Sequence, residues 1–218
     1  MTAHDAVLFD LDGVLVDSRA AISRCINHAL DAHGLPEHAP ASLHRFIGPP
    51  LPAVFAELIG QPADSAVVLS CIKAYLARYA TASLSDTTVI AGMPDTLAEL
   101  ACSYRLAVAT SKSLAFADPL LAALGLREHF DVIAGPDLNA HGEEKAVTIR
   151  RALSMLDVDR AVMVGDRKYD IAAAREHDIP CIGVLWGVGS EKELLTAGAD
   201  ALAHSPAELA GLLTPSPS

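Results

Sequence analysis

Residues Ala6 to Gly13 have the sequence Ala-Val-Leu-Phe-Asp-Leu-Asp-Gly, so four apolar side chains run directly into two carboxylates and a glycine. A continuous apolar run of this length is typical of a strand that is covered on both faces. Asp10 and Asp12 follow that strand two residues apart, and Gly13 allows a bend that would bring both carboxylates to one point. The stretch predicts a buried strand with a polar site at its carboxyl end, although a helix cap or a solvated turn would also account for the two carboxylates.

Similar apolar runs recur along the rest of the chain, and segments with helical spacing of apolar residues separate them. These runs lie at 106–110, 132–134, 161–165 and 181–185. Alternating strands and helices of this length predict an α/β core, a doubly wound parallel sheet of the Rossmann-like type with helices on both faces.

The segment from 17 to 88 differs, because it contains no convincing buried strand and its apolar residues recur at helical spacing. We expect a helical cap domain at 17–88, inserted after the first strand of a core made of 1–16 and 89–213. The residues at 214–218 are expected to form a frayed tail.

The composition excludes several classes of protein. The chain has 218 residues, of which 51% are hydrophobic, and a net charge of −11. This predicts a folded chain rather than a disordered one, and a poor partner for the phosphate backbone of nucleic acids. No apolar run reaches the roughly 18 residues that a membrane span requires. Four widely spaced cysteines indicate reduced thiols, so we expect a cytoplasmic protein. The net charge and the short apolar runs lead us to expect neither nucleic-acid nor membrane partners.

Two further polar signals follow predicted strands or begin predicted helices. Thr110 and Ser111 offer a hydroxyl and free backbone N–H groups at a strand-to-helix junction, which suits a phosphate group but also a simple helix cap. Lys145 stands near the start of a helix, where a cation is disfavoured, and this hints at an anion that it serves. A surface pair with Glu143 or Glu144 is the alternative for Lys145, and we expect the fold to tolerate its loss as for any solvated lysine.

The last signal is a pair of carboxylates, Asp166 and Asp170, which follow a buried strand and Gly165. Spaced four residues apart, they can present oxygen ligands to a hard cation. Helix capping by Asp166, with Asp170 solvated, is the alternative.

In this order at the ends of strands of one sheet, the signals resemble the motifs of the haloacid dehalogenase-like hydrolase superfamily. The stretch Phe9-Asp-Leu-Asp-Gly-Val-Leu-Val-Asp-Ser18 is similar to its first motif, Thr110 to the second, Lys145 to the third, and Gly165-Asp166 with Asp170 to the fourth. The insertion resembles the cap of the phosphoglycolate phosphatase-like branch, and residues 165–170 and 183–190 resemble members assigned as phosphoglycolate phosphatases or 5′-nucleotidases. One departure is that Lys145 follows Gly-Glu-Glu rather than the Gly-Lys-Pro commonly seen.

The resemblance implies a Mg²⁺-dependent phosphatase that forms an aspartyl-phosphate. Asp10 would be the nucleophile, and Asp12 would protonate the leaving oxygen and then activate water. The resemblance also implies that Mg²⁺ binds to the Asp10 carboxylate, the Asp12 backbone carbonyl and the Asp166 carboxylate, with Asp170 binding directly or through water. It further implies that the phosphate group is bound by Thr110, the Ser111 amide and Lys145.

The substrate is the least determined property. Within the cap, Phe46 and Gly48 belong to a turn that carries no charged side chain after Arg45, which favours a small substrate such as phosphoglycolate or a nucleoside monophosphate. Arg24 on the first cap helix could reach such a substrate or could simply be solvated. We expect a monomer or a homodimer.

Other functions remain as alternatives. A sugar phosphomutase would share the cap and the covalent intermediate, and sequence separates it poorly from a phosphatase. A dehalogenase is disfavoured because a halide leaving group needs no acid at Asp12. A phosphorylation-controlled regulator similar to receiver domains is disfavoured because such domains carry the phosphorylated aspartate on a middle strand and lack a cap.

Overall fold

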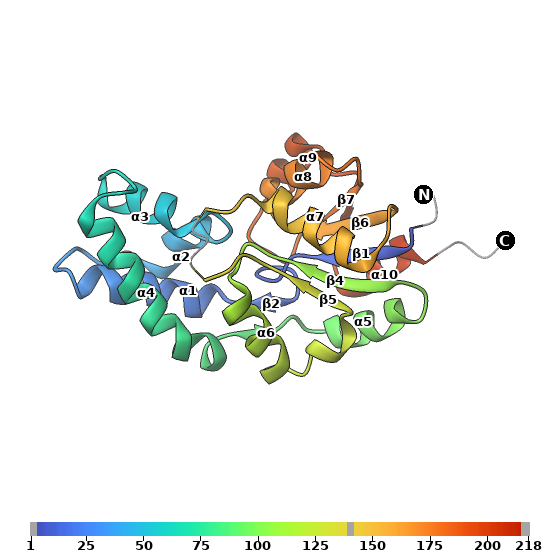
Figure 1. Ribbon diagram of the computed structural model, residues 1–218, viewed down its shortest axis with the longest axis horizontal. Helices are drawn as coiled ribbons and strands as arrows, with labels where there is room; N and C mark the ends of the chain where they lie inside the picture. The colour runs from blue at the N-terminus through green and yellow to red at the C-terminus, as the bar shows by residue number, and fades with distance from the viewer. Residues whose placement is uncertain (1–3, 139–141, 215–218) are drawn as a thin grey trace.

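The computed structural model describes residues 4–138 and 142–214, and it divides into a sheet with flanking helices and a group of helices beside it (Figure 1). Of the tail expected at 214–218, only Thr214 lies within the described residues. Among those residues no helix combines the length and the apolar character needed to cross a bilayer.

The central sheet has six parallel strands in the order β5-β4-β1-β6-β7-β8, which confirms the predicted doubly wound α/β core. Its strands are β1 (Ala6–Phe9), β4 (Arg105–Ala109), β5 (Val132–Ala134), β6 (Ala161–Gly165), β7 (Cys181–Val184) and β8 (Ala201–Ala203). Strand β1 lies between β4 and β6, and the order of the strands along the chain reverses direction there. The carboxyl ends of these three strands therefore flank the switch point where open sheets bind ligands.

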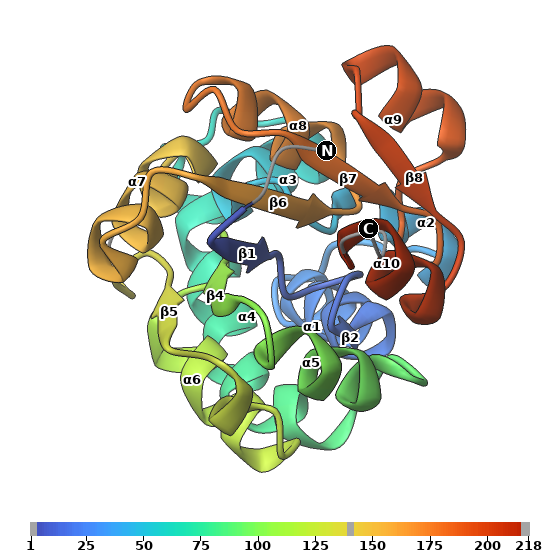
Figure 2. The ribbon, with the colours of Figure 1, turned by 90° about the vertical axis from the view of Figure 1, so that its right-hand side faces the viewer.

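Helices cover both faces of the sheet because the strand residues alternate between two apolar layers (Figure 2). In β1, Val7 and Phe9 join one layer, whereas Ala6 and Leu8 join the other. The first layer includes α5 (Met93–Ala101), α6 (Leu114–Ala123) and α10 (Pro206–Leu213), and the second includes α7 (Lys145–Leu156), α8 (Lys168–Arg175) and α9 (Glu191–Ala197).

Between β2 (Val16–Asp17) and β3 (Thr88–Val89) the chain is helical, and this part has an apolar core of its own. It contains α1 (Arg19–Asp31), α2 (Pro40–Leu43), the short 3₁₀ turn η1 (His44–Phe46), α3 (Leu51–Ile59) and α4 (Ala66–Ser85). Between residues 18 and 87, all of which are described, there is no strand. We call this group of helices the insertion.

Two features of the fold were not predicted. A two-residue antiparallel pair, β2 (Val16–Asp17) with β3 (Thr88–Val89), joins the entry and the exit of the insertion. Strand β8, with the sequence Ala-Leu-Ala, is short and half-exposed at the edge of the sheet and contains no β-branched residue, so its apolar run is a weak strand signal.

Candidate active site

The chain turns sharply directly after β1, and the turn depends on Gly13. The Gly13 N–H donates to the Val16 carbonyl at 2.8 Å, and the Leu15 N–H donates to the Leu11 carbonyl at 3.0 Å. Gly13 has φ +83°, and a Cβ there would lie 2.3 Å from Asp166 Oδ2. Both the backbone conformation and the close approach of Asp166 therefore require glycine.

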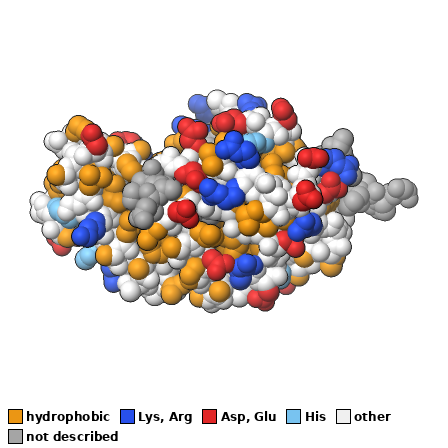
Figure 3. Space-filling view, viewed as in Figure 1, with side chains coloured by type: hydrophobic (Ala, Val, Ile, Leu, Met, Phe, Trp, Pro, Cys, Tyr) orange, Lys and Arg blue, Asp and Glu red, His pale blue; other side chains and the backbone are white. Residues whose placement is uncertain are grey.

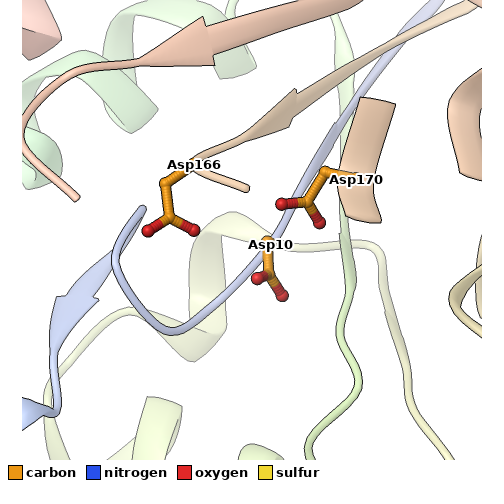
Figure 4. Close-up of side chains that lie close together, drawn as sticks. All are labelled: Asp10, Asp166 and Asp170. Atoms are coloured by element: carbon orange, nitrogen blue, oxygen red, sulfur yellow. The ribbon is translucent and has the colours of Figure 1, made fainter. Parts of the chain in front are cut away.

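Three buried carboxylates meet at this end of the sheet, from Asp10, Asp166 and Asp170 (Figure 4). Each contributes an oxygen that lies within 4.8 Å of the other two. Asp10 follows β1, Asp166 follows β6, and Asp170 stands in the first turn of α8. The parallel neighbours β1 and β6 thus bring Asp10 to two carboxylates that are more than 150 residues away in the sequence.

Lys145, the first residue of α7, lies buried against this cluster. Its Nζ is 2.7 Å from Asp10 Oδ1 and 2.8 Å from Asp170 Oδ1. Burial by itself lowers the pKa of Lys145, but the charges of Asp10 and Asp170 outweigh burial and raise that pKa. Lys145 is therefore an internal counter-charge, which corrects the expectation that it behaves as a solvated lysine.

The negative charge of the cluster is only partly neutralised, because it contains three carboxylates and one ammonium group. Burial raises the pKa of Asp10 to about 6 against the opposing charge of Lys145. Burial, followed by the charges of Asp170 and Asp10, raises the pKa of Asp166 well above its ordinary value. Such shifts mark a place where negative charge is costly in the absence of a further cation.

The free oxygen atoms fit a hard divalent cation. Asp166 Oδ2 accepts from the Val188 N–H at 2.7 Å, whereas the buried Oδ1 has no hydrogen-bond partner among the described residues. Both oxygens of Asp170 are already engaged, with Lys145 and with the Arg167 N–H at 3.0 Å. Mg²⁺ prefers oxygen ligands and takes one or two carboxylates together with water or phosphate, so Asp10 and Asp166 are suitable ligands.

The Asp12 carboxylate is not one of the three clustered carboxylates, although it lines the same cavity as Asp10. Its Oδ1 lies 2.6 Å from Lys112 Nζ. On a straight strand residues two apart face the same way, but here the chain leaves the strand after Phe9 and turns around Leu11. Any metal contact of Asp12 is thereby left to its backbone carbonyl, as the family resemblance implies.

A cavity of about 140 Å³ lies between this end of the sheet and the insertion. In the outline of the molecule the two parts are separated by an indentation (Figure 3). Asp10, Asp12, Thr110 and Ser111 line the cavity from the sheet side. From the insertion it is lined mainly by apolar and aromatic residues, namely Ile22, Phe46, Ile47, Gly48, Pro49, Pro50, Leu51, Pro52, Tyr75, Leu76 and Tyr79.

The structure thus places Phe46 and Gly48 at the cavity, but not Arg24. Arg24 Nη1 pairs with Asp86 Oδ2 at 2.6 Å, and its side chain is 63% exposed. Thr110 is buried, and its Oγ1 accepts from the Lys112 N–H at 3.1 Å. Lys145 lies behind Asp10 and is not among the residues that line the cavity.

Sequence reasoning gave no role to Arg167, although it lies inside the fourth motif. The Arg167 side chain is nearly buried, its Nη1 donates to the Ile47 carbonyl at 2.5 Å, and its Nε donates to Glu193 Oε1 at 2.9 Å. Arg167 directly follows Asp166, and its side chain therefore links this end of the sheet to the turn of the insertion that lines the cavity. The positive charge of Arg167 beside Asp166 was the signal available in the sequence, but the partners of Arg167 lie far from it along the chain.

Known proteins with a similar sequence or fold are described as hydrolases and phosphatases. The model of the haloacid dehalogenase-like hydrolase family matches residues 7–184. A 5′-nucleotidase of Pseudomonas aeruginosa is 36% identical over 191 residues, which cover 86% of this chain and 86% of that protein. A plasmid-encoded phosphoglycolate phosphatase of Cupriavidus necator is 35% identical over 215 residues, covering 96% and 93%. A crystal structure described as a predicted phosphatase from Clostridium acetobutylicum superposes with a TM-score of 0.91 at 33% identity, covering 97% of this chain and 99% of that one.

Proposed function

The chain belongs to the haloacid dehalogenase-like hydrolase family and is a phosphatase of that family, and we propose that it hydrolyses small phosphomonoesters with Mg²⁺ through an aspartyl-phosphate on Asp10. The observation that carries the proposal is the cluster of Asp10, Asp166 and Asp170 around Lys145, at the strand ends that border the cavity. A buried excess of carboxylates beside a cavity suits a divalent cation and an anionic substrate together.

A phosphomonoester is an anion that another anion must attack, so charge repulsion is the first obstacle. Bound to Asp10, Asp166 and the Asp12 carbonyl, Mg²⁺ would withdraw charge from the phosphate oxygens. Lys145 Nζ lies 2.7 Å from Asp10 Oδ1 and would hold this carboxylate in place while one of its oxygens attacks phosphorus. Thr110 and the Ser111 amide, which line the cavity from the same side as Asp10, would neutralise phosphate oxygens.

The proton transfers fall to Asp12. As the Asp10 oxygen bonds to phosphorus, the bond from phosphorus to the ester oxygen breaks, and that oxygen takes a proton from Asp12. In the second half, water attacks phosphorus, Asp12 takes a proton from the water, and Asp10 is released together with inorganic phosphate. Asp12 lines the cavity from which the leaving group departs.

The charges around the cavity favour an uncharged leaving group. None of the lining residues of the insertion, all of them described, is charged, and the sheet side adds Asp137 and Glu143. Lys112 is the one cation among the described lining residues, and it already forms an ion pair with Asp12. A second carboxylate, as in phosphoglycolate, would enter an acidic cavity, whereas a nucleoside meets the stacked rings of Tyr75 and Tyr79. We therefore propose nucleoside 5′-monophosphates as the substrate class.

The covalent mechanism is tested with Asp10→Asn, which keeps the shape of the side chain and removes the nucleophile. We expect wild-type protein with Mg²⁺ to release phosphate and to yield an acid-trapped phosphoenzyme, and Asp10→Asn to do neither. Asp64→Asn, an exposed aspartate of the insertion, is the matched control. Wild-type turnover in Asp10→Asn would disprove the mechanism, and conversion of a sugar phosphate to its isomer without phosphate release would indicate a mutase.

The substrate class is tested by comparing kcat/KM for nucleoside monophosphates with that for phosphoglycolate. We expect a preference of about tenfold or more for the nucleotides, since one unfavourable charge contact of about 1.4 kcal/mol suffices for that factor. A preference for phosphoglycolate would contradict the argument that the acidic lining of the cavity disfavours a second carboxylate.

A further inference from the structure

We propose that Lys112 is a positioning residue that orients the Asp12 carboxylate, and that Tyr79 of the insertion holds Lys112 in the position where it does so. The inference rests on the proposed function, because it assigns Asp12 the proton transfers. Lys112 Nζ lies 2.6 Å from Asp12 Oδ1, and the two side chains are 7% and 14% exposed. The two residues are 100 positions apart, so the contact exists only in the folded chain.

The backbone of Lys112 is fixed by the loop that follows β4. Its N–H donates to Thr110 Oγ1 at 3.1 Å, and Thr110 is itself buried. The Lys112 carbonyl packs so closely on Gly135 that a Cβ there would lie 2.6 Å from it. A long, flexible side chain therefore starts from a rigid base, which limits the positions that its ammonium can reach.

The insertion supplies the other restraint. Lys112 Nζ lies 5.2 Å from the centre of the Tyr79 ring, within the range of a cation–π contact. That ring is held in turn, because it stacks on Tyr75 at 5.4 Å and meets Phe116 edge-on at 5.5 Å. The ammonium is thus placed between an aromatic face of α4 and the Asp12 carboxylate.

The two lysines of the site contact different carboxylates. Lys145 contacts Asp10 and Asp170, whereas Lys112 contacts Asp12. Removal of the Lys112 ammonium should therefore disturb proton transfer to the leaving oxygen and leave the metal cluster and the nucleophile in place. A residue that served the phosphate itself would affect every substrate alike.

The experiment compares two phosphomonoesters in Lys112→Met, which removes the charge and keeps most of the side-chain length. Ethyl phosphate needs its leaving oxygen protonated, whereas 2,4-dinitrophenyl phosphate does not. We expect kcat to fall about 10²-fold for ethyl phosphate, within the range of general acid catalysis, and less than about threefold for the dinitrophenyl ester. Lys73→Met, an exposed lysine of α4, is the control and should show neither loss.

A double mutant separates positioning from other roles. If Lys112 acts through Asp12, then Lys112→Met should add no further loss to Asp12→Asn. For the insertion, Tyr79→Leu removes the ring and should shift the ratio of the two substrates in the direction of Lys112→Met, and by more than Tyr79→Phe, which keeps the ring. Should Tyr79→Leu fail to fold, the Lys112 and Asp12 variants still decide the matter.

The outcomes distinguish this inference from the proposed function. Equal losses on both substrates, or additive losses in the double mutant, would overturn the role of Lys112 while leaving the phosphatase mechanism intact. If wild-type protein released phosphate from neither ester nor from nucleoside monophosphates, or if Asp10→Asn stayed active, the proposed function would fail and the inference with it.

Discussion

At the scale of single residues, burial disfavours the charged form of the Asp10 carboxylate, so the stability of the fold should depend on the protonation of Asp10. The pKa of Asp10 is raised to about 6 in the folded protein, from an ordinary value of about 3.9 in an unfolded chain. Between these two values the folded state binds more protons than the unfolded state. The contribution of Asp10 to stability is therefore present below about pH 4 and is lost as the pH rises to about 6.

We expect the free energy of unfolding of wild-type protein in EDTA to fall across that pH window relative to Asp10→Asn. The slope is about 1.4 kcal/mol per pH unit for one carboxyl, so the total is on the order of 3 kcal/mol. Mg²⁺ should raise the melting temperature more at pH 7.5 than at pH 5, since protonated carboxyls bind it poorly. Parallel pH profiles of wild type and Asp10→Asn would contradict the burial of a charged Asp10.

Lys145 offers a second test at this scale, because its loss should affect both activity and stability. Lys145→Ala leaves Asp10 and Asp170 buried without their counter-charge, which costs on the order of 3 kcal/mol. We also expect kcat/KM to drop roughly 10²-fold or more. Denaturant unfolding and steady-state kinetics measure the two effects, with Lys192→Ala, an exposed lysine of α9, as the control. Unchanged stability would mean that the carboxylates are compensated in another way.

At the scale of elements, the turn of the insertion that covers the cavity is fastened to the start of α8. Arg167 donates to the Ile47 carbonyl and to Glu193, and its Cγ lies 3.7 Å from a Cβ built on Gly48. Tyr169 packs beside the same glycine. Arg167, the residue after Asp166, therefore connects the carboxylate cluster to the turn of the insertion that lines the cavity.

Arg167→Met should loosen that turn, because it removes the donors and keeps an apolar side chain in the same space. A hydrogen bond to a charged group contributes about 1.5–3 kcal/mol, so we expect KM to rise by roughly tenfold or more. Hydrogen exchange of residues 46–51 should become faster. Glu193→Gln keeps the guanidinium on Ile47 and serves as the control. Unchanged exchange at 46–51 in Arg167→Met would show that the prolines alone hold the turn.

At the scale of the whole molecule, the insertion and the sheet have separate apolar cores. The three clustered carboxylates directly follow β1, directly follow β6 and belong to α8, and the insertion supplies none of them. Substrate, by contrast, would contact both parts, since both line the cavity.

Mg²⁺ alone should therefore slow hydrogen exchange in β1, β6 and α8 more than in α1 and α4. Mg²⁺ with inorganic phosphate should extend the protection to residues 46–51. Mass spectrometry of proteolytic fragments resolves these segments. Equal protection of α1 and β1 by Mg²⁺ alone would show that the two cores open as one cooperative unit.

Much of the fold is determined by local sequence. Strand β1 is evident because four apolar residues end in Asp10, and the helical insertion is evident because its apolar residues recur at helical spacing. The position of Asp10, Thr110 and Asp166 directly after three apolar runs also predicts that they meet, since parallel strands end at one edge of a sheet. These are properties of short segments and of one general rule of topology.

Only the tertiary structure decided which side chains compensate one another. The contacts of Lys145 with Asp10, of Lys112 with Asp12 and of Arg167 with Ile47 each join residues more than 90 positions apart. Ion pairs and hydrogen bonds of this kind act over a few ångströms, and their partners are fixed by packing rather than by spacing along the chain. The sequence therefore determined which groups stand at the strand ends, whereas folding determined that Asp12 turns to Lys112 and that Lys145 is buried between two carboxylates.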